Sequence, residues 1–512
     1  MIHPSKIHPS NFQFKSVAIL ITGAFAGLLI PLARHLKQTH GSAIHCYVKS
    51  EQERRGLQKE IDNGIFDTVT AIPNILVVEG MENTGSQEWR EKALHYEKQV
   101  GRTFQQMTFT HRALGRGYNA GGLYYPSVKK VKEWNYDNFL RYYCAVMEFW
   151  ERELTEKQVT LNIQTPFECI AMAQSLDIPH RRLDASRVGD YWIWTYDEFH
   201  VNSDVARTFE TGNAPRQAPT VPYKTFSANS YFGKSHLMTV MKRVLYYNVV
   251  RLRLYFGRGG QGIHRYSEML RMIFEEYVQR RKYRASLAKK LPDIGDNPFF
   301  YLPLHKEPET GLQMMSPEFF NQHWMVMALA QYLPAGVLLL VKENNKTFGR
   351  RPYSFYEQIS DLKNVVLVDD SQSSLELIEK ALCTVTISGS AGFEAAVSGK
   401  PTISFGQHNM YNVLPHVMVV EKIGDLKEYV SRVIAGDFDQ NAARALGEQY
   451  LGSVIKHSFD MEEGGAGGIF HRDVIEEKEL VGRAADALVD TFPSPVDHKN
   501  KIDPVLQSAE IA

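Results

Sequence analysis

Short apolar runs alternate with amphipathic segments between residues 299 and 404, and this alternation constrains the fold more than any other feature of the chain. Strands that alternate with helices predict a parallel sheet with helices on both faces. The five predicted strands are Phe299–Leu304, Gly336–Val341, Val365–Val368, Thr384–Ile387 and Pro401–Ser404. The four predicted helices are Pro317–Leu333 (capped by Ser316), Tyr353–Ile359, Ser374–Ala381 and Gly392–Ser398. Together these elements predict a complete Rossmann-like domain.

A similar alternation is predicted near the N-terminus. The apolar segment Val17–Ala33 has a membrane anchor or signal peptide as its alternative, but it is shorter than the roughly 20 residues of a membrane span and contains glycines and a proline. We expect a strand over Val17–Thr22, a turn at Gly23, and a helix over Leu28–Gln38 that Gly41 ends. The further predicted strands are Ala43–Val48, Ile65–Val69, Asn74–Val78, Val159–Ile163 and one starting in Ile178–Leu183, and the further helices are Tyr136–Leu154 and Pro166–Ser175.

The chain is therefore expected to be an α/β protein with two Rossmann-like domains that face a cleft and a basic helical insertion between them. Ligands of such folds bind at the carboxyl ends of the parallel strands. A linker is expected in the proline-rich segment 200–228, and a flexible loop at Gly464–Gly468. The predicted parts are a flexible lead-in (1–15), the N-terminal domain (16–200), the linker and basic segment (201–294), the C-terminal domain (295–430), C-terminal helices (431–492) and a tail (493–512).

Composition argues against several classes of protein. The chain has 58 Lys and Arg residues against 58 Asp and Glu residues, whereas nucleic-acid-binding domains are strongly basic, so no nucleic-acid partner is expected. The four cysteines form no CxxC pair, which argues against a zinc ribbon and a disulfide framework and favours a cytoplasmic location. No cluster of His, Asp and Glu has metal-ligand spacing, so no metal site is predicted.

One segment departs from this balance of charge. Residues 228–290 carry 14 Lys and Arg residues and three acidic ones, with tyrosines between them. This pattern is consistent with contact to an anionic membrane surface. It is equally typical of an amphipathic helical subdomain whose charge is balanced elsewhere in the chain.

The most informative candidate site lies in Thr386–Gly406. Its small residues would form a turn before a helix, where backbone N–H groups can approach an anionic ligand, and they are Ser388, Gly389, Ser390 and Gly392. Glu394, expected in the first helical turn, would accept hydrogen bonds from vicinal hydroxyls. The alternative is a tight turn in which Glu394 complements the helix dipole. The pattern is neither GxGxxG nor a Walker A loop, which argues against nicotinamide cofactors and ATP.

Three other loops follow predicted strands of the same domain. His305 and Glu307 come after the first strand and are candidates for ligand contact, with an ordinary solvated loop as the alternative. Lys342 ends the second strand and, with Arg350 downstream, could neutralise a phosphate, whereas Arg351 could be a surface charge. Ser373 could bind phosphate in addition to capping the following helix.

Residues 299–415 resemble the C-terminal half of the bacterial capsule polysaccharide biosynthesis family, which includes Kdo transferases. The resemblance is carried by FFYLPLHKEPET, LPAGVLLLVKEN, NVVLVDDSQSSLELIEKA and TVTISGSAGFEAAVSGKPTISFG, and a weaker one covers Val159–Asp190. It implies a GT-B-like fold in which the C-terminal domain holds a nucleotide-activated sugar. By this resemblance the donor site would be lined by Lys342, Ser388, Gly389, Ser390 and Glu394, with Ser373 near the phosphate. The chain departs from the family at Glu343–Asn345, where Lys-x-His-Pro is common, so a different donor sugar is compatible with it.

The predicted function is metal-independent transfer of a sugar from a nucleotide-sugar donor to a polysaccharide or lipid-linked acceptor, without a further cofactor. A base for the acceptor proton is expected in the N-terminal domain, and the candidates are Glu168 and Asp184, each with a purely structural alternative. The alternative functions are a sugar-nucleotide epimerase, a polyol-phosphate transferase, and a non-catalytic carbohydrate-binding assembly component.

Overall fold

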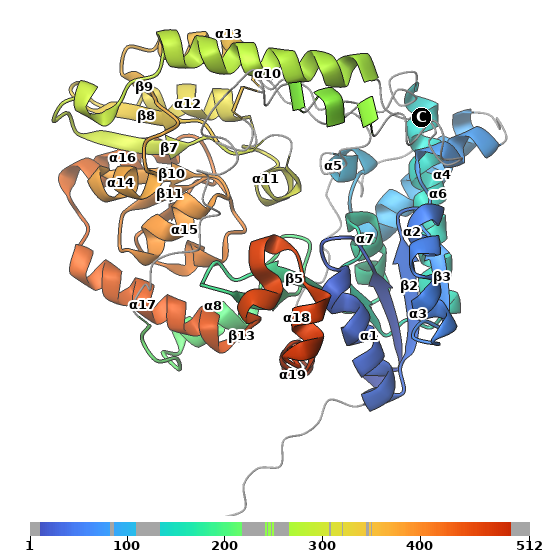
Figure 1. The fold of residues 1–512 in the computed structure, drawn as a ribbon. Helices are drawn as coiled ribbons and strands as arrows, with labels where there is room; N and C mark the ends of the chain where they lie inside the picture. The colour runs from blue at the N-terminus through green and yellow to red at the C-terminus, as the bar shows by residue number, and fades with distance from the viewer. Residues whose placement is uncertain are drawn as a thin grey trace, which may run out of the picture. The chain divides into compact units, whose positions relative to one another are not determined.

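The computed structural model describes residues 11–81, 86–108, 134–217, 241–249 (without 243 and 247), 266–306, 309–319, 321–344, 348–349 and 351–492. The chain divides into two compact units. Unit 1 comprises Met1–Met107, Trp134–Arg207 and Val454–Ala512, and unit 2 comprises Thr108–Glu133 and Thr208–Ser453. Each unit is built on one sheet of mainly parallel strands with helices around it, which confirms the predicted α/β class (Figure 1).

The sheet of unit 1 has the strand order β13-β6-β5-β4-β1-β2-β3. Its strands are β1 (Ser16–Leu20), β2 (Ala43–Val48), β3 (Thr68–Ala71), β4 (Leu161–Ile163), β5 (His180–Ala185), β6 (Tyr191–Thr195) and β13 (Ser458–Asp460). Strand β6 runs antiparallel to both neighbours, and β1 to β5 are parallel. The predicted strand Asn74–Val78 is wrong: β3 ends before Pro73, which has no N–H for pairing, and a 3-10 helix, η2 (Ile75–Gly80), follows.

The helices of unit 1 connect and cover these strands. They are η1 (Asn11–Phe14), α1 (Ala26–His40), α2 (Glu51–Gly56), α3 (Gln58–Asp62), α4 (Ser86–Val100), α5 (Phe104–Thr108), α6 (Tyr136–Glu156) and α7 (Phe167–Ser175). Helix α1 ends at Gly41 in the left-handed conformation (φ 66°), as predicted. The apolar segment Val17–Ala33 is thus divided between β1 and α1. Among the helices that the structure describes, none combines the length and apolar character that a membrane crossing requires.

The C-terminal part of the chain returns to unit 1. It supplies β13, the 3-10 helix η7 (Glu462–Gly468), α18 (Arg472–Glu477) and α19 (Val481–Asp490). Residues of α18 and α19 share one buried core with the apolar side of α1. The flexible loop predicted at Gly464–Gly468 is wrong, because Gly465 packs against Trp192: a Cβ there would lie 2.3 Å from the indole nitrogen. Glycine serves close packing at this position.

The sheet of unit 2 is fully parallel and has the order β12-β11-β10-β7-β8-β9. Its strands are β7 (Phe299–Pro303), β8 (Leu338–Lys342), β9 (Val365–Val368), β10 (Cys383–Thr386), β11 (Thr402–Ser404) and β12 (Val417–Val419). The remaining helices are α8 (Ser203–Glu210) and α17 (Gln440–Lys456), which cross the unit boundary, and α10 (Tyr266–Ser286), η5 (Leu291–Asp293), α11 (Thr310–Met315), α12 (Gln322–Ala330), α13 (Tyr353–Ser360), α14 (Ser374–Lys380), α15 (Ser390–Val397), η6 (Met410–Val413) and α16 (Asp425–Ala435).

Two predicted elements of this region need correction. The helix expected from Pro317 to Leu333 is shorter: of the described helices only α12 lies in this range, and Asn321 caps it by accepting the N–H of Trp324, while α11 ends before Pro317. Ser316 follows the last residue of α11 and is not the N-cap of α12, because its hydroxyl donates to the Phe405 carbonyl at 2.8 Å. The segment 200–228 was expected to be a linker, but its first part forms α8.

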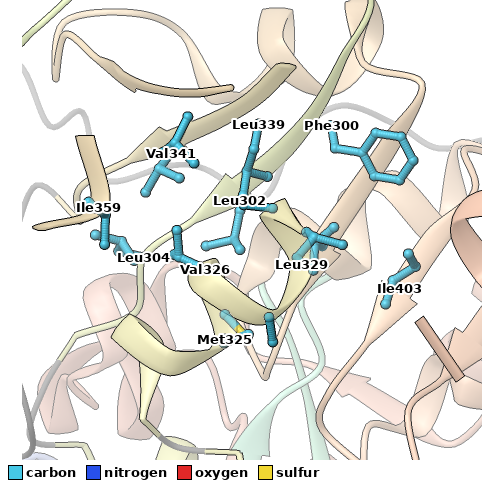
Figure 2. Close-up of a cluster of buried hydrophobic side chains, with 14 of the residues drawn as sticks. Phe300, Leu302, Leu304, Met325, Val326, Leu329, Leu339, Val341, Ile359 and Ile403 are labelled. Atoms are coloured by element: carbon cyan, nitrogen blue, oxygen red, sulfur yellow. The ribbon is translucent and has the colours of Figure 1, made fainter. Parts of the chain in front are cut away.

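Both faces of the unit 2 sheet are buried. On one face Phe300, Leu302 and Leu304 of the β7 segment and Leu339 and Val341 of β8 pack against Met325, Val326 and Leu329 of α12 (Figure 2). On the other face Tyr301 and Leu340 pack against residues of α14 and α15. Strands buried on both sides need apolar side chains at every position, which is why these strands are continuous apolar runs in the sequence.

Candidate functional site

The chain reverses its direction of winding in unit 2 between β7 and β10. From β7 it moves outward to β8 and β9, then crosses to the other side of β7 to form β10, β11 and β12. The carboxyl ends of strands at such a reversal are where open α/β sheets bind ligands. The loop after β7 carries His305, and the loop after β10 carries Ser388 and Gly389, so both predicted loops lie at this point.

These two loops are joined by hydrogen bonds. His305 Nε2 accepts the backbone N–H of Ser388 at 3.1 Å and lies 3.2 Å from Thr386 Oγ1, which also accepts the N–H of Gly389. A Cβ on Gly389 would lie 3.0 Å from His305 Nε2, so the close approach of the loops leaves little room for a side chain here. His305, predicted as a ligand contact, is only 5% exposed and shapes the loop that follows β10.

Buried side chains from two other segments hold His305 in place. Its backbone N–H donates to Gln322 Oε1 at 2.5 Å, and its carbonyl accepts from the Gln322 amide at 3.2 Å and from Arg351 Nη2 at 2.6 Å. The sequence analysis missed Gln322 and Thr386, and it considered Arg351 as a surface charge. That interpretation of Arg351 is wrong, because the residue is 2% exposed.

Helix α15 begins at Ser390 and has no side-chain cap at its N-terminus. A Cβ on Gly392 would lie 2.3 Å from Thr386 Cγ2, so this glycine lets the first turn pack on the end of β10. Uncapped backbone N–H groups and the helix dipole favour an anion at such a start. Glu394 lies beyond the first turn, so the expected placement in that turn, and with it the dipole interpretation, is wrong.

Lys342 lies on the sheet face that α14 and α15 cover. It is 6% exposed, and its Nζ donates to Ser374 Oγ at 3.3 Å; the same hydroxyl accepts from Tyr301 Oη at 3.2 Å. Burial lowers the pKa of Lys342, while Asp370, Glu343 and Asp369 act to raise it. No carboxylate among the described residues forms an ion pair with Lys342. A buried cation without an ion pair suits an anionic ligand.

Two more predicted residues, Glu394 and Ser373, lie near the side chains that surround Lys342. Glu394 lies close enough to Tyr301 for its charge to add to burial in raising the pKa of that phenol. Ser373 caps α14 by accepting the N–H of Glu376 at 3.4 Å, so its capping role is confirmed, and the serine that contacts Lys342 is the next one, Ser374. Ser390 is exposed at the start of α15. Glu307 and Arg350, also predicted as donor contacts, lie outside the described residues.

The position after Lys342 is a buried ion pair. Glu343 accepts from Arg351 Nε at 2.8 Å and from Tyr356 Oη at 2.7 Å, and the backbone N–H of Asn344 donates to its other oxygen. Glu343 and Arg351 are 1% and 2% exposed. This pair fixes the chain directly after β8 and connects it through Arg351 to the carbonyl of His305.

The two base candidates lie in unit 1: Glu168 follows β4, and Asp184 lies in the neighbouring strand β5. Glu168 is in the first turn of α7 and is 5% exposed. Asp184 accepts from Thr195 Oγ1 at 2.9 Å and lies 3.2 Å from His200 Nδ1 and 3.7 Å from Arg182 Nε. Burial would raise the pKa of Asp184, but His200, Arg182 and Thr195 hold it well below its usual range. A carboxylate this weakly basic is a poor proton acceptor near neutral pH.

No family model and no curated protein sequence matches this chain. Solved structures that match include the KpsC β-Kdo 2,7 transferase of Thermosulfurimonas dismutans (11% identical, TM-score 0.32, covering 66% of this chain and 88% of that one). They also include the UDP-GlcNAc 2-epimerase of Neisseria meningitidis bound to UDP-GlcNAc (12%, 0.26, 86% and 97%) and MurG of Acinetobacter baumannii (11%, 0.26, 86% and 99%). A Kdo transferase, the kind of enzyme that the sequence resemblance names, is thus among them. Because these TM-scores are below 0.5, the similarities assign no role to any residue of this chain.

Proposed function

We propose that this protein is a metal-independent glycosyltransferase that takes a sugar from a nucleotide donor and adds it to a polysaccharide or lipid-linked acceptor of a bacterial surface carbohydrate. One observation carries the proposal: the buried cation Lys342, without an ion pair among the described residues, lies on the sheet face that α15 covers, and the N-terminus of α15 is uncapped. Both features favour a bound phosphate at the carboxyl edge of the unit 2 sheet.

The chemistry of transfer needs what this edge supplies. When the sugar leaves its nucleotide, negative charge grows on the departing phosphate. Lys342 and the backbone N–H groups at the start of α15 would stabilise that charge, and Glu394 would accept hydrogen bonds from donor hydroxyls. His305, Gln322 and Arg351 would keep the two loops in the geometry that binding requires, before any donor arrives.

The test is thermal unfolding of the full-length protein with CMP, CDP, UDP or GDP, with and without magnesium. A ligand that binds only the folded state stabilises it by about 2.7 kcal/mol at one hundred times its dissociation constant. We expect one nucleotide to raise the melting temperature without magnesium, and Lys342→Met and Glu394→Ala to lose most of that rise. Ser398→Ala, an exposed change at the other end of α15, is the matched control and should keep it. No rise with any of the four nucleotides would contradict the proposal and favour a non-catalytic carbohydrate-binding component.

A sugar-nucleotide epimerase or a polyol-phosphate transferase would share the nucleotide-dependent rise in melting temperature. Products separate these functions from sugar transfer. An epimerase converts the donor alone into its stereoisomer, which NMR of the donor mixture detects, whereas a polyol-phosphate transferase leaves phosphate on the acceptor. Transfer by the proposed route releases a nucleoside mono- or diphosphate and adds no phosphorus to the acceptor.

Attachment to an anionic membrane surface is a further part of the proposal, and α10 supports it. Its exposed side carries Arg271, Phe274, Val278, Arg281 and Lys282, at spacings that place them on one side of the helix. Phe274 and Val278 are 48% and 45% exposed. Apolar side chains between cations are typical of helices that lie in the headgroup region of anionic lipids, where a cytoplasmic enzyme would meet a lipid-linked acceptor.

A further inference from the structure

Polar side chains line one face of β5, from its first residue, His180, towards the carboxyl edge of the unit 1 sheet. Side chains alternate along a strand, so His180, Arg182 and Asp184 share a face. His180 pairs with Asn162 of β4, whose amide contacts Thr165 and Cys169 at the start of α7, and this places the shared face on the α7 side. Strand β5 continues beyond the last paired residue of β4, so Asp184 lies past the end of that neighbour.

Three of the side chains at this face have nitrogen atoms without partners. His180 is 2% exposed, and both of its ring nitrogens lack a hydrogen-bond partner in the described part of the chain. The same holds for Arg182 Nε and for His200 Nε2, which reaches this face through Asp184. Most buried polar groups in proteins are hydrogen-bonded, because leaving one without a partner costs stability. A ligand that supplies hydroxyl groups would satisfy such atoms along this face of β5.

His200 is held in the orientation of a proton acceptor. Its Nδ1 lies 3.2 Å from Asp184 Oδ1, and the low pKa of Asp184 keeps that carboxylate ionised, so in the neutral imidazole the tautomer with its hydrogen on Nδ1 and the lone pair on Nε2 is favoured. Thr195 donates to the other carboxylate oxygen and fixes Asp184 in turn. The backbone of His200 has a φ of 64°, a conformation that residues other than glycine adopt mainly where the surrounding structure imposes it.

We propose that this face of β5 binds a sugar hydroxyl of the acceptor and that His200 is the base that takes its proton, with Asp184 as the positioning residue. The inference rests on the proposed function and adds His200 to it, while the predicted base candidate Asp184 becomes a positioning residue. The acceptor O–H bond breaks, its proton moves to Nε2, and the oxygen forms a bond to the anomeric carbon. The bond from that carbon to the phosphate oxygen breaks and leaves its electron pair on the nucleotide. The imidazolium then gives the proton to water.

The experiment measures nucleotide release by the full-length protein from the sugar nucleotide whose nucleotide raises the melting temperature, with water as acceptor. His200→Gly and His200→Asn both tolerate a positive φ, so the backbone is expected to keep its conformation. Loss of a base should lower kcat about 10²–10⁴-fold, while KM for the donor and the donor-dependent rise in melting temperature stay unchanged. Added imidazole should restore part of the rate in His200→Gly, because the glycine leaves space for it.

Two further variants distinguish positioning from catalysis. Asp184→Asn should lower kcat with the donor KM unchanged, since it removes the charge that orients the imidazole, and imidazole should not rescue it. Thr195→Val, which removes one hydrogen bond to Asp184, should change kcat less than tenfold. Wild-type turnover in His200→Gly and His200→Asn would overturn the assignment while the proposed function stands. No nucleotide binding and no turnover in the wild type would overturn both.

Discussion

The carboxyl edges of the two sheets differ in how their polar side chains are hydrogen-bonded. In unit 2 the side chains of the edge mostly bond to one another: His305 accepts from Ser388, and Glu343 accepts from Arg351 and Tyr356. What remains for a ligand is a helix start and one buried cation. In unit 1, by contrast, nitrogen atoms of His180, Arg182 and His200 have no hydrogen-bond partner in the described part of the chain. The first edge is suited to holding a fixed negative charge, and the second to exchanging a proton.

This difference has a physical reason. A phosphate is bound best by groups that are already in place, because reorganising dipoles during the reaction costs free energy. A base must keep a lone pair for the substrate, so its nitrogen cannot be bonded inside the protein. The predictions below test whether the two edges differ in this way, beginning with the largest expected effect.

The strongest internal bond of the unit 2 edge is the Glu343–Arg351 pair. Glu343→Ala leaves a buried guanidinium without its counter-charge, and we expect the free energy of unfolding to fall by about 3–5 kcal/mol in urea titrations. Glu51→Ala removes an exposed pair with Arg54, whose side chains are 59% and 41% exposed, and should cost less than about 1 kcal/mol. Equal losses in the two variants would show that burial of the unit 2 pair does not matter.

The unit 1 edge is flanked by Asp197, whose neighbours act opposite to those of Asp184. Burial and the charge of Glu198 raise the pKa of Asp197 to about 7, against the lowering effect of backbone N–H groups and Arg102. Between the ordinary Asp pKa and 7 the folded protein holds a proton that the unfolded chain has lost, so this group's contribution to stability is lost as pH rises to 7. The free energy of unfolding of Asp197→Asn should therefore rise by about 2 kcal/mol relative to that of the wild type between pH 5 and pH 8, as measured by thermal unfolding. A constant difference would contradict the raised pKa.

Substitutions of two glycines at the start of α15 should distinguish an effect on stability from an effect on nucleotide binding. A Cβ on Gly392 would meet Thr386 Cγ2 at 2.3 Å and Tyr411 Oη at 2.7 Å, so Gly392→Ala should lower the free energy of unfolding by about 1–3 kcal/mol. A Cβ on Gly389 would meet only His305 Nε2 at 3.0 Å, so Gly389→Ala should cost less stability and mainly reduce the nucleotide-dependent rise in melting temperature. The reverse ranking would mean that the turn at Gly389 supports the fold and not the ligand.

The smallest change per substitution is expected in the binding of anionic vesicles by the exposed side of α10. Each cation near an anionic bilayer contributes about 1 kcal/mol, so Arg271→Glu, Arg281→Glu and Lys282→Glu should each weaken binding to phosphatidylglycerol vesicles at least about fivefold at low salt. Arg55→Glu and Lys59→Glu change the net charge equally at exposed positions of unit 1 and are the controls. Equal binding to phosphatidylcholine vesicles, or equal loss in the controls, would contradict a specific lipid-facing side.

The strands β7 to β11 of unit 2 were predictable because each is a short apolar run, and burial on both faces needs no knowledge of the partner strand. The short strand β12 was not predicted. β13 was not predictable in this way, since three residues pair with β6, which lies more than 260 positions earlier in the chain. The start of α12 was predicted too early for a similar reason: serine often caps helices, but the Ser316 hydroxyl donates to the Phe405 carbonyl, and Asn321 caps α12 instead.

The candidate sites likewise were predictable where local sequence patterns determine them, and not where contacts between distant segments do. The loops after β7, β8 and β10 were predicted as ligand contacts because the carboxyl edge of a parallel sheet is a property of the alternation itself. Which atoms meet there was not predictable: Ser374 rather than Ser373 contacts Lys342, and His200 accompanies Asp184. The sequence by itself therefore determined the α/β class, most strands, and the edge at which polar residues would gather. The tertiary structure decided which of them are bonded inside the protein and which keep an atom for a ligand, because a hydrogen bond depends on distances between segments that local patterns do not encode.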